Sequence, residues 1–431
     1  MDFGGLCPPC RKDDSSMVEK KLLPNGVRVI YEPLDHVRSC AIGVWVENGS
    51  CHEPDELSGM AHFIEHMLFK GTETRTAAQL AQAFDGIGGQ VNAFTTKEHT
   101  CFYARTLDTH VQTAADLLCD MVLHSVFAQR DLDLERGVVL EEIGMYEDSP
   151  EDLVSEILSA ACFPGQPLGR PILGYDKTLA AIDHAAMSRY HRTHYVAENT
   201  IVTLSGSFTE KDLQAVCSLF SAMPSGQRNR LPSACYQKAA VVKKKEIEQN
   251  HLLLVFPAVS AADPGRYPLA VLNNILGAGM SSRLFQRVRE RSGLCYSIYS
   301  YTSLYASAGV LGVYVALGRE MQHDALGMIR EELLLLREEG VTQDELVRAK
   351  EQLKTSLLMG LESTSTRMSA LARSEMTYGS YISPRETAAL LEAVTREDVQ
   401  SLARQVLDFS RLSFSAVGNV DAPETYLALL H

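Results

Sequence analysis

The sequence predicts an α+β protein built from two homologous domains, each a mostly antiparallel β-sheet packed with α-helices. Strands and helices come in separate blocks rather than in regular alternation, which argues against a doubly wound parallel sheet. The order of predicted elements in the first half recurs in the second half, which indicates an internal duplication. The length of 431 residues fits two or three domains.

Composition narrows the class of protein. Apolar residues make up 45% of the chain and charged residues 22%, as in globular proteins. With 40 basic against 54 acidic residues, the formal net charge is −14, which disfavours nucleic acid as a partner and attracts cationic peptides. No apolar run reaches the ~18 residues of a membrane span, so we expect no membrane anchor.

The ten cysteines favour a reducing compartment. Many lie inside apolar runs, as reduced core cysteines do, and we therefore predict a cytoplasmic protein. Residues 1–16 lack the apolar segment of a secretory signal and are predicted to form a disordered tail. Cys7 and Cys10 in this tail have the spacing of half a redox or metal site, but no second such pair accompanies them, so they receive no role.

The first domain begins with strands. Residues 20–33 are predicted to form a hairpin with a turn at 24–26, and the β-branched run 40–48 forms a further strand. A helix then opens near residue 58 and ends at Gly71, because glycine suits the left-handed cap. The remaining elements, in order, are helix 77–84, strands 90–96 and 100–106, and helices 109–125 and 131–147.

The second half repeats this order of elements. We expect strand 252–256, helices 267–276 and 284–290, strands 295–302 and 309–317, and helices 320–338 and 343–361. Between the halves, residues 225–248 are basic and polar without a sustained period, and are predicted to be the linker. The predicted domains are therefore 17–224 and 249–431.

A metal-binding pattern lies on the first helix of the first domain. It reads His62-Phe63-Ile64-Glu65-His66. Because a helix turns ~100° per residue, the two histidines and the glutamate share one face. Two histidines at this spacing suit a divalent metal, with the glutamate free to act on the metal's water, as in the inverted form of the zinc-protease motif.

A catalytic zinc ion also needs a third protein ligand and an open position for water. Helix 131–147 offers Glu135, Glu141 and Glu142. Glu135 and Glu142 return to nearly the same helix face, whereas Glu141 points about 100° away. If Glu142 binds the metal, Glu135 is placed to hydrogen-bond a ligand histidine. Spacing alone does not choose between Glu141 and Glu142.

The second copy lacks all of these residues. Alignment of the two halves on their helix-ending glycines sets His62, Glu65 and His66 opposite Ala270, Asn273 and Asn274. Glu142 falls opposite Thr355. The joint loss supports the interpretation that the residues of the first copy form a single site.

Three segments of the first half resemble a known family. Residues 62–72, 88–95 and 135–143 are similar to the pitrilysin/insulinase zinc peptidases, and most similar to their short bacterial branch, which resembles the mitochondrial processing peptidase. The similarity runs from about residue 17 to the C-terminus and includes 167–174 and 276–285.

The resemblance implies roles for the residues of the first domain, which would be the catalytic one. It implies His62, His66 and Glu142 as ligands of one zinc ion per chain, because the spacing from His66 to Glu142 is that of the family. It also implies Glu65 as the general base and Glu135 as the partner of a ligand histidine.

Further residues are implied to contact the substrate. The resemblance identifies an edge strand that pairs with the substrate backbone, formed by Asn92, Ala93, Phe94 and Thr95. It also implies that Arg289 and Tyr296, from the inactive second domain, reach the scissile carbonyl.

The function implied by the resemblance is that of a zinc-dependent endopeptidase whose two halves form a clamshell. Its substrates would be unfolded or presequence-like peptides, basic ones included, and its assembly a homodimer, or else a heterodimer with a sister subunit. The alternative is a non-catalytic binding or assembly subunit, although such members of the family lose motif residues that this chain keeps. A eukaryotic organellar subunit would carry an Arg-rich transit peptide, which 1–16 does not resemble, unless its presequence had already been removed. We expect a bacterial cytoplasmic enzyme.

Overall fold

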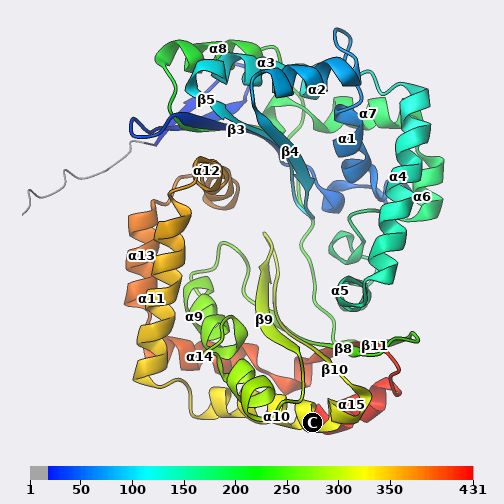
Figure 1. Cartoon of the computed structure of the whole chain (residues 1–431), viewed down its shortest axis with the longest axis vertical. Helices are drawn as coiled ribbons and strands as arrows, with labels where there is room; N and C mark the ends of the chain where they lie inside the picture. Colours follow the sequence, from blue (N-terminus) through cyan, green and yellow to red (C-terminus); the bar gives the residue numbers. More distant parts are fainter. Residues whose placement is uncertain (1–17, 431) are drawn as a thin grey trace, which may run out of the picture.

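The computed structural model describes residues 18–430, and the predicted tail at 1–16 lies outside them. Two β-sheets with their helices face each other as the halves of a clamshell (Figure 1). The predicted α+β class with two homologous domains is confirmed. None of the helices within 18–430 combines the length and the apolar character that crossing a bilayer requires.

The first half is built on a six-stranded sheet with the order β1-β2-β6-β3-β5-β4. Its strands are β1 (Glu19–Leu22), β2 (Arg28–Pro33), β3 (Ser39–Val46), β4 (Gln90–Thr95), β5 (Thr100–Leu107) and β6 (Thr200–Gly206). Its helices are α1 (Met60–Leu68), α2 (Ala77–Gly86), α3 (Val111–His124), α4 (Gln129–Asp148), α5 (Pro150–Cys162), α6 (Asp176–Ala181), α7 (His184–His194) and α8 (Glu210–Phe220). Because β4 ends this sheet, one of its edges has no partner strand among the described residues.

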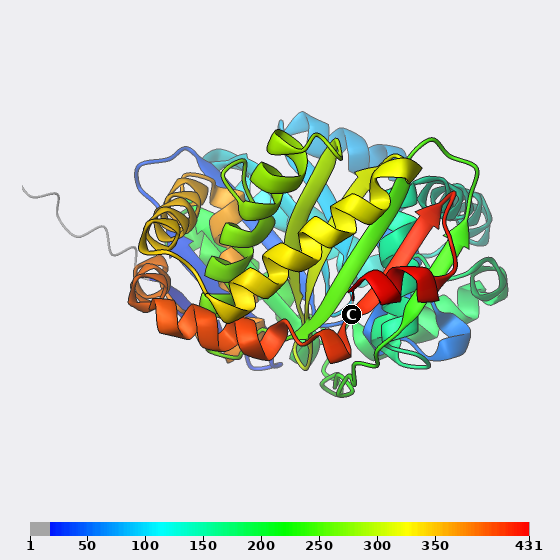
Figure 2. The same cartoon turned by 90° about the horizontal axis from the view of Figure 1, so that it is seen from below.

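The second half is built on a five-stranded sheet with the order β7-β11-β8-β10-β9. Its strands are β7 (Ala240–Lys244), β8 (Asn250–Ala258), β9 (Ser297–Leu304), β10 (Gly309–Leu317) and β11 (Ser413–Gly418). Its helices are α9 (Arg266–Gly277), α10 (Gln322–Glu338), α11 (Gln343–Gly360), α12 (Thr364–Tyr378), α13 (Pro384–Ala393), α14 (Arg396–Val406) and α15 (Pro423–Leu430). Seen from below, α10 crosses the outer face of this sheet (Figure 2).

The strand pairings of the two sheets follow one pattern. A parallel pair, β2 with β6 or β7 with β11, leads through antiparallel pairs to an edge strand, β4 or β9. By this pattern β7 is the counterpart of β2. The predicted linker 225–248 therefore has to be corrected, since it contains the first strand of the second sheet. Its sequence hid this strand because β7 is short, partly exposed and ends in two lysines, so no alternation of apolar and polar residues marks it.

Each half covers the inner sheet face of the other half with one helix. Helix α5 packs on β8 and β11 of the second sheet, and α12 packs on β3 and β6 of the first sheet (Figure 1). The apolar cluster under α12 contains Trp45, Ile201, Met368 and Leu371. The cluster under α5 contains Leu153, Leu158, Leu253 and Tyr314. Neither helix was predicted from the sequence, although each carries a local start signal, Ser149 followed by Pro150 for α5 and Ser363 for α12. What the sequence does not show is that each helix packs on the sheet of the opposite half.

Ion pairs also hold α12 on the first half. Arg367 pairs with the buried carboxylate of Glu32 at 2.6 Å, and Lys20 pairs with the buried carboxylate of Glu375 at 2.6 Å. A carboxylate withdrawn from water in this way is costly unless it is paired. Helix α12 is therefore held on the first half by specific ion pairs as well as by burial of its apolar side chains.

Candidate metal centre and adjoining cavity

Helix α1 is held at its start by a buried carboxylate. Glu53 accepts hydrogen bonds from the backbone N–H groups of Gly59 and Ala61, at 2.8 and 2.7 Å. Burial raises the pKa of Glu53 to about 8. Gly59 has φ +97°, and a Cβ atom there would lie 2.6 Å from the carbonyl oxygen of Leu173. The predicted helix 58–71 therefore begins at Met60 and ends at Leu68, which fixes the position of His62, Glu65 and His66 on its half-buried face.

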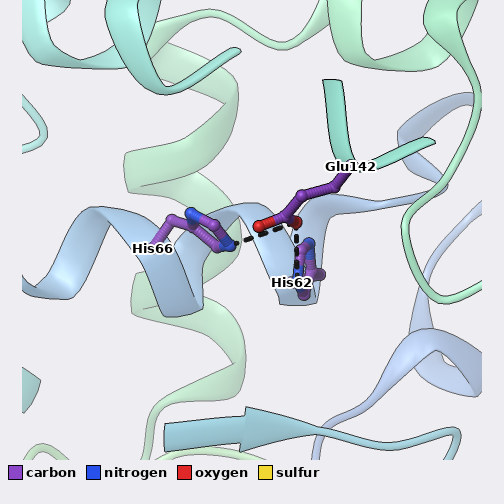
Figure 3. A group of neighbouring side chains, drawn as sticks. All are labelled: His62, His66 and Glu142. Carbon is purple, nitrogen blue, oxygen red and sulfur yellow. Dashed lines mark ion pairs between the residues drawn. The ribbon is translucent and has the colours of Figure 1, made fainter. Parts of the chain in front are cut away.

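Three side chains converge where α1 meets α4. The Nε2 atoms of His62 and His66 lie 3.7 and 3.6 Å from the same carboxylate oxygen of Glu142 (Figure 3). The candidate ligand atoms of the three residues all lie within 4.8 Å of one another. Two ligands that each bind a tetrahedral ion at ~2 Å are about 3.3 Å apart, so this donor set fits a zinc ion with little adjustment.

Electrostatics favours the form of histidine that binds metals. Burial, together with the nearby His66, lowers the pKa of His62 to about 3, so its ring is neutral and offers a lone pair. Of the two candidate glutamates on α4, Glu142 points to both histidines and Glu141 is exposed. Helical spacing left Glu141 and Glu142 open as the third ligand, and in the structure only Glu142 of these two lies beside the histidines.

A chain of contacts behind the site orients His66. Its Nδ1 atom lies 3.2 Å from Glu135, and the other carboxylate oxygen of Glu135 pairs with Lys70 at 2.7 Å. A carboxylate on the outer nitrogen of a histidine fixes the tautomer that leaves Nε2 free for a metal. Lys70 lies four residues after His66, just beyond the end of α1, and this spacing is the signal in the sequence that could have identified it.

The predicted general base is also held in place. The hydroxyl of Thr95 donates a hydrogen bond to Oε2 of Glu65 at 2.5 Å, and the hydroxyl of Thr100 lies 3.4 Å behind it. Burial raises the pKa of Glu65, which keeps this carboxylate a better proton acceptor than one in water. The contact gives Thr95 a place beside the base, in addition to its predicted place in the substrate strand.

A cavity of about 610 Å³ adjoins these residues and is lined by both halves. One wall carries His62 and Glu65 of α1 with residues of β4, and the facing walls belong to α5 and to the β9–β10 hairpin. The acidic lining residues from α5 are Glu151, Asp152 and Glu156. The aromatic lining residues are Phe94, Tyr146, Phe163, Tyr299, Tyr301 and Tyr305.

The cavity contains only part of the predicted substrate-contacting set. Ala93, Phe94 and Thr95 line it, whereas Asn92 is not among its lining residues. Arg289 and Tyr296 are also absent from the lining. They contact each other instead, with the guanidinium of Arg289 5.1 Å from the ring of Tyr296, whose surface is 76% exposed.

The segment that carries Arg289 differs from its prediction. An ordinary helix is expected at 284–290, whereas the structure has a π-helix at Phe285–Arg291. Such segments are rare and occur often at functional sites. The acidic and aromatic residues of α5 and β9 went unassigned in the sequence because each becomes part of the cavity only when the halves meet.

Models of two protein families match successive parts of the chain. Residues 28–176 match the family described as insulinase (peptidase family M16), and residues 181–353 match the family described as peptidase M16 inactive domain. The chain is 42% identical over 407 residues to a Bacillus subtilis protein named uncharacterized zinc protease YmxG, which covers 94% of this chain and 100% of that protein.

Solved structures share the fold at low sequence identity. A crystal structure of a peptidase M16 inactive domain from Pseudomonas fluorescens matches with a TM-score of 0.88 at 22% identity, over 94% of this chain and 99% of that one. A chain of complex III2 from Candida albicans matches with a TM-score of 0.84 at 19% identity, over 96% of this chain and 100% of that one.

The placement of Glu142 leads to a prediction about zinc content. Glu142→Gln removes the charged oxygen that faces both histidines, and should weaken zinc binding by more than the ~10–100-fold typical of losing an outer partner. Glu141→Gln, on the next residue, is the matched control and should bind zinc as the unaltered chain does. Zinc titration of both purified variants measures this. Equal affinities would show that Glu142 is not a ligand.

Proposed function

The chain belongs to the insulinase family of peptidases (M16), in the short form found in bacteria, and from this membership we propose that it is a zinc-dependent endopeptidase acting on unfolded peptides. The observation that carries the proposal is the convergence of His62, His66 and Glu142, of which His62 lines the cavity together with Glu65. One zinc ion per chain would occupy this donor set. When bound there, zinc would polarise the scissile carbonyl and lower the pKa of the attacking water to ~7.

The protein's own groups supply the proton transfers. Thr95 occupies Oε2 of Glu65, which leaves Oε1 to accept the proton of the attacking water. The same oxygen then delivers this proton to the nitrogen of the leaving amine. Glu135 and Lys70 hold His66 in one orientation, so the donor set does not have to reorganise during the reaction.

The free edge of β4 supports a peptide substrate bound in extended form. An added strand hydrogen-bonds through its backbone, so the sequence preference would be loose and the substrate would have to be unfolded. Three carboxylates of α5 face the cavity. Lys97, which also lines the cavity, donates a hydrogen bond to the backbone carbonyl of Arg170. This balance favours basic peptides over acidic ones.

Arg289 and Tyr296 are proposed to stabilise the charge on the scissile carbonyl oxygen. Because they stack on each other outside the cavity lining, this role requires the segment 289–296 to move toward the site when a substrate binds. The exposure of Tyr296 and its place after a π-helix are consistent with such a movement.

Assembly and location remain proposals of the same kind. A homodimer would complete a chamber from two chains, and a heterodimer with a sister subunit is the alternative. The cysteines among residues 18–430 carry free thiols, which supports the bacterial cytoplasm as the location.

The non-catalytic alternative finds its support in one similarity. The fold match to a chain of complex III2 shows that this architecture also occurs in an assembly of that name. The present chain, however, keeps His62, His66 and Glu142 in one cluster and Glu65 beside it. The presence of all four residues favours catalysis.

The proposed function is tested by Glu65→Gln. The amide cannot accept the proton of the attacking water, and the residue is not among the three candidate ligands, so the variant should keep its zinc and lose hydrolysis of an unstructured basic peptide. Metal analysis and a peptide-cleavage assay on the same sample measure both properties. Loss of zinc together with activity would show that Glu65 is a ligand and that the assignment is wrong.

The role of the second half is tested by Tyr296→Phe. Loss of one donor to the developing oxyanion should lower kcat by roughly 10² or more, while KM and zinc content change little, because the bond strengthens only as charge develops. Steady-state kinetics with the same peptide measures the two constants separately. Unaltered turnover would mean that Tyr296 does not contact the reacting carbonyl.

A further inference from the structure

The tips of two β-hairpins, one from each half, are joined by one hydrogen bond. The backbone N–H of Ala306, in the β9–β10 turn, donates to Oε1 of Glu98, in the β4–β5 turn, at 2.8 Å. The carboxylate of Glu98 is half-buried, and its burial raises its pKa. We name this contact the hairpin bridge. It connects segments 208 residues apart in the chain.

The β4–β5 turn is rigidly attached to the first half. The hydroxyl of Thr96 accepts the N–H groups of Glu98 and His99, at 3.2 and 3.0 Å. The N–H of Cys51 donates to the carbonyl of Lys97 at 2.7 Å, which ties the turn to the segment that precedes α1. Glu98 is therefore presented from a fixed backbone rather than from a mobile loop.

The β9–β10 turn is equally well tied to its own surroundings. The N–H of Tyr305 donates to the carbonyl of Ala308 at 2.8 Å, and the N–H of Ala261 donates to the carbonyl of Tyr305 at 2.9 Å. Ser307 accepts the N–H of Ala234 at 3.0 Å. The hairpin bridge thus connects two stiff turns, so that the position of one tip depends on the position of the other.

The two hairpins border the cavity from opposite sides. Their outer strands, β4 and β9, are the edge strands of their sheets. Phe94 and Thr95 of β4 line the same cavity as Tyr301 and Tyr305 of the β9–β10 hairpin. A peptide lying along the free edge of β4 would have the β9–β10 hairpin opposite, and the bridge joins the tips of these two walls.

From this arrangement we propose that Glu98 is a positioning residue for substrate binding, which fixes the spacing between β4 and the β9–β10 hairpin by accepting the N–H of Ala306. The proposal rests on the proposed peptidase function, since it assigns the cavity to a peptide. Glu98 itself takes no part in proton transfer and contacts no candidate metal ligand. Its loss should therefore affect binding rather than zinc or the chemical step.

The choice of substitutions separates this role from a general effect of charge. Glu98→Gln keeps an oxygen that accepts the N–H of Ala306, so it should preserve the bridge, whereas Glu98→Ala removes the acceptor. Ala306→Pro removes the donor from the other side of the same contact, because proline has no N–H. Glu248→Ala, at an exposed position before β8, is the control for losing one negative charge.

Binding is measured on zinc-loaded Glu65→Gln protein, so that no turnover is needed. Fluorescence anisotropy with a labelled, unstructured basic peptide gives Kd for each of the four substitutions in that background. We expect Glu98→Ala and Ala306→Pro to raise Kd about tenfold, and Glu98→Gln and Glu248→Ala to change it less than twofold. Zinc content should be equal in all variants. Hydrogen exchange at residues 305–308 should accelerate in Glu98→Ala but not in Glu98→Gln.

The outcomes distinguish failure of this inference from failure of the proposed function. Faster exchange in Glu98→Ala with an unchanged Kd would show that the bridge forms but positions nothing, and would overturn the inference. Unchanged hydrogen exchange in Glu98→Ala would show that the bridge is absent, and would also overturn the inference. No peptide binding by Glu65→Gln protein with Glu98 intact would overturn the proposed function, and the role of Glu98 with it. If Glu98→Ala fails to fold, Ala306→Pro decides.

Discussion

The exchange of helices between the two halves is the constraint on which the rest of the structure depends. Each sheet has an apolar inner face, and α5 or α12 from the opposite half covers it. A buried leucine or methionine contributes roughly 1.5–3 kcal/mol. Neither sheet keeps this stabilisation without the other half. The two halves are thus held in one relative position, and the cavity exists only because of it.

The same constraint places the candidate metal centre beside the second half. Glu142 lies near the end of α4, and α5 begins two residues after α4 ends, so the ligand helix leads directly into the exchanged helix. The acidic residues of α5 then face a cavity whose opposite wall holds Glu65. The candidate metal ligands, the general base and part of the cavity wall therefore come from α1, α4 and α5, which contact one another in that order.

Sequence reasoning predicted the features that depend on short spacing. The shared face of His62, Glu65 and His66 follows from helical geometry, and the repeated order of strands and helices follows from local patterns. The choice of Glu142 over Glu141 needed either the family resemblance or the structure. Features set by contacts between distant segments were missed, among them the packing of α5 and α12 on the opposite sheets and the aromatic wall of the cavity. Strand β7 was missed because its short sequence shows no alternation of apolar and polar residues. The absence of Tyr296 from the cavity lining also could not be predicted, because it depends on how the two halves meet.

We infer that one zinc ion is held by His62, His66 and Glu142, of which His62 lines the cavity. The most direct measurement is anomalous diffraction on either side of the zinc absorption edge, from crystals of the zinc-loaded chain. We expect one peak per chain, within ~2.0–2.2 Å of Nε2 of both histidines and of a carboxylate oxygen of Glu142. A peak at any other position, or a peak at this position that Glu142 does not contact, would contradict it.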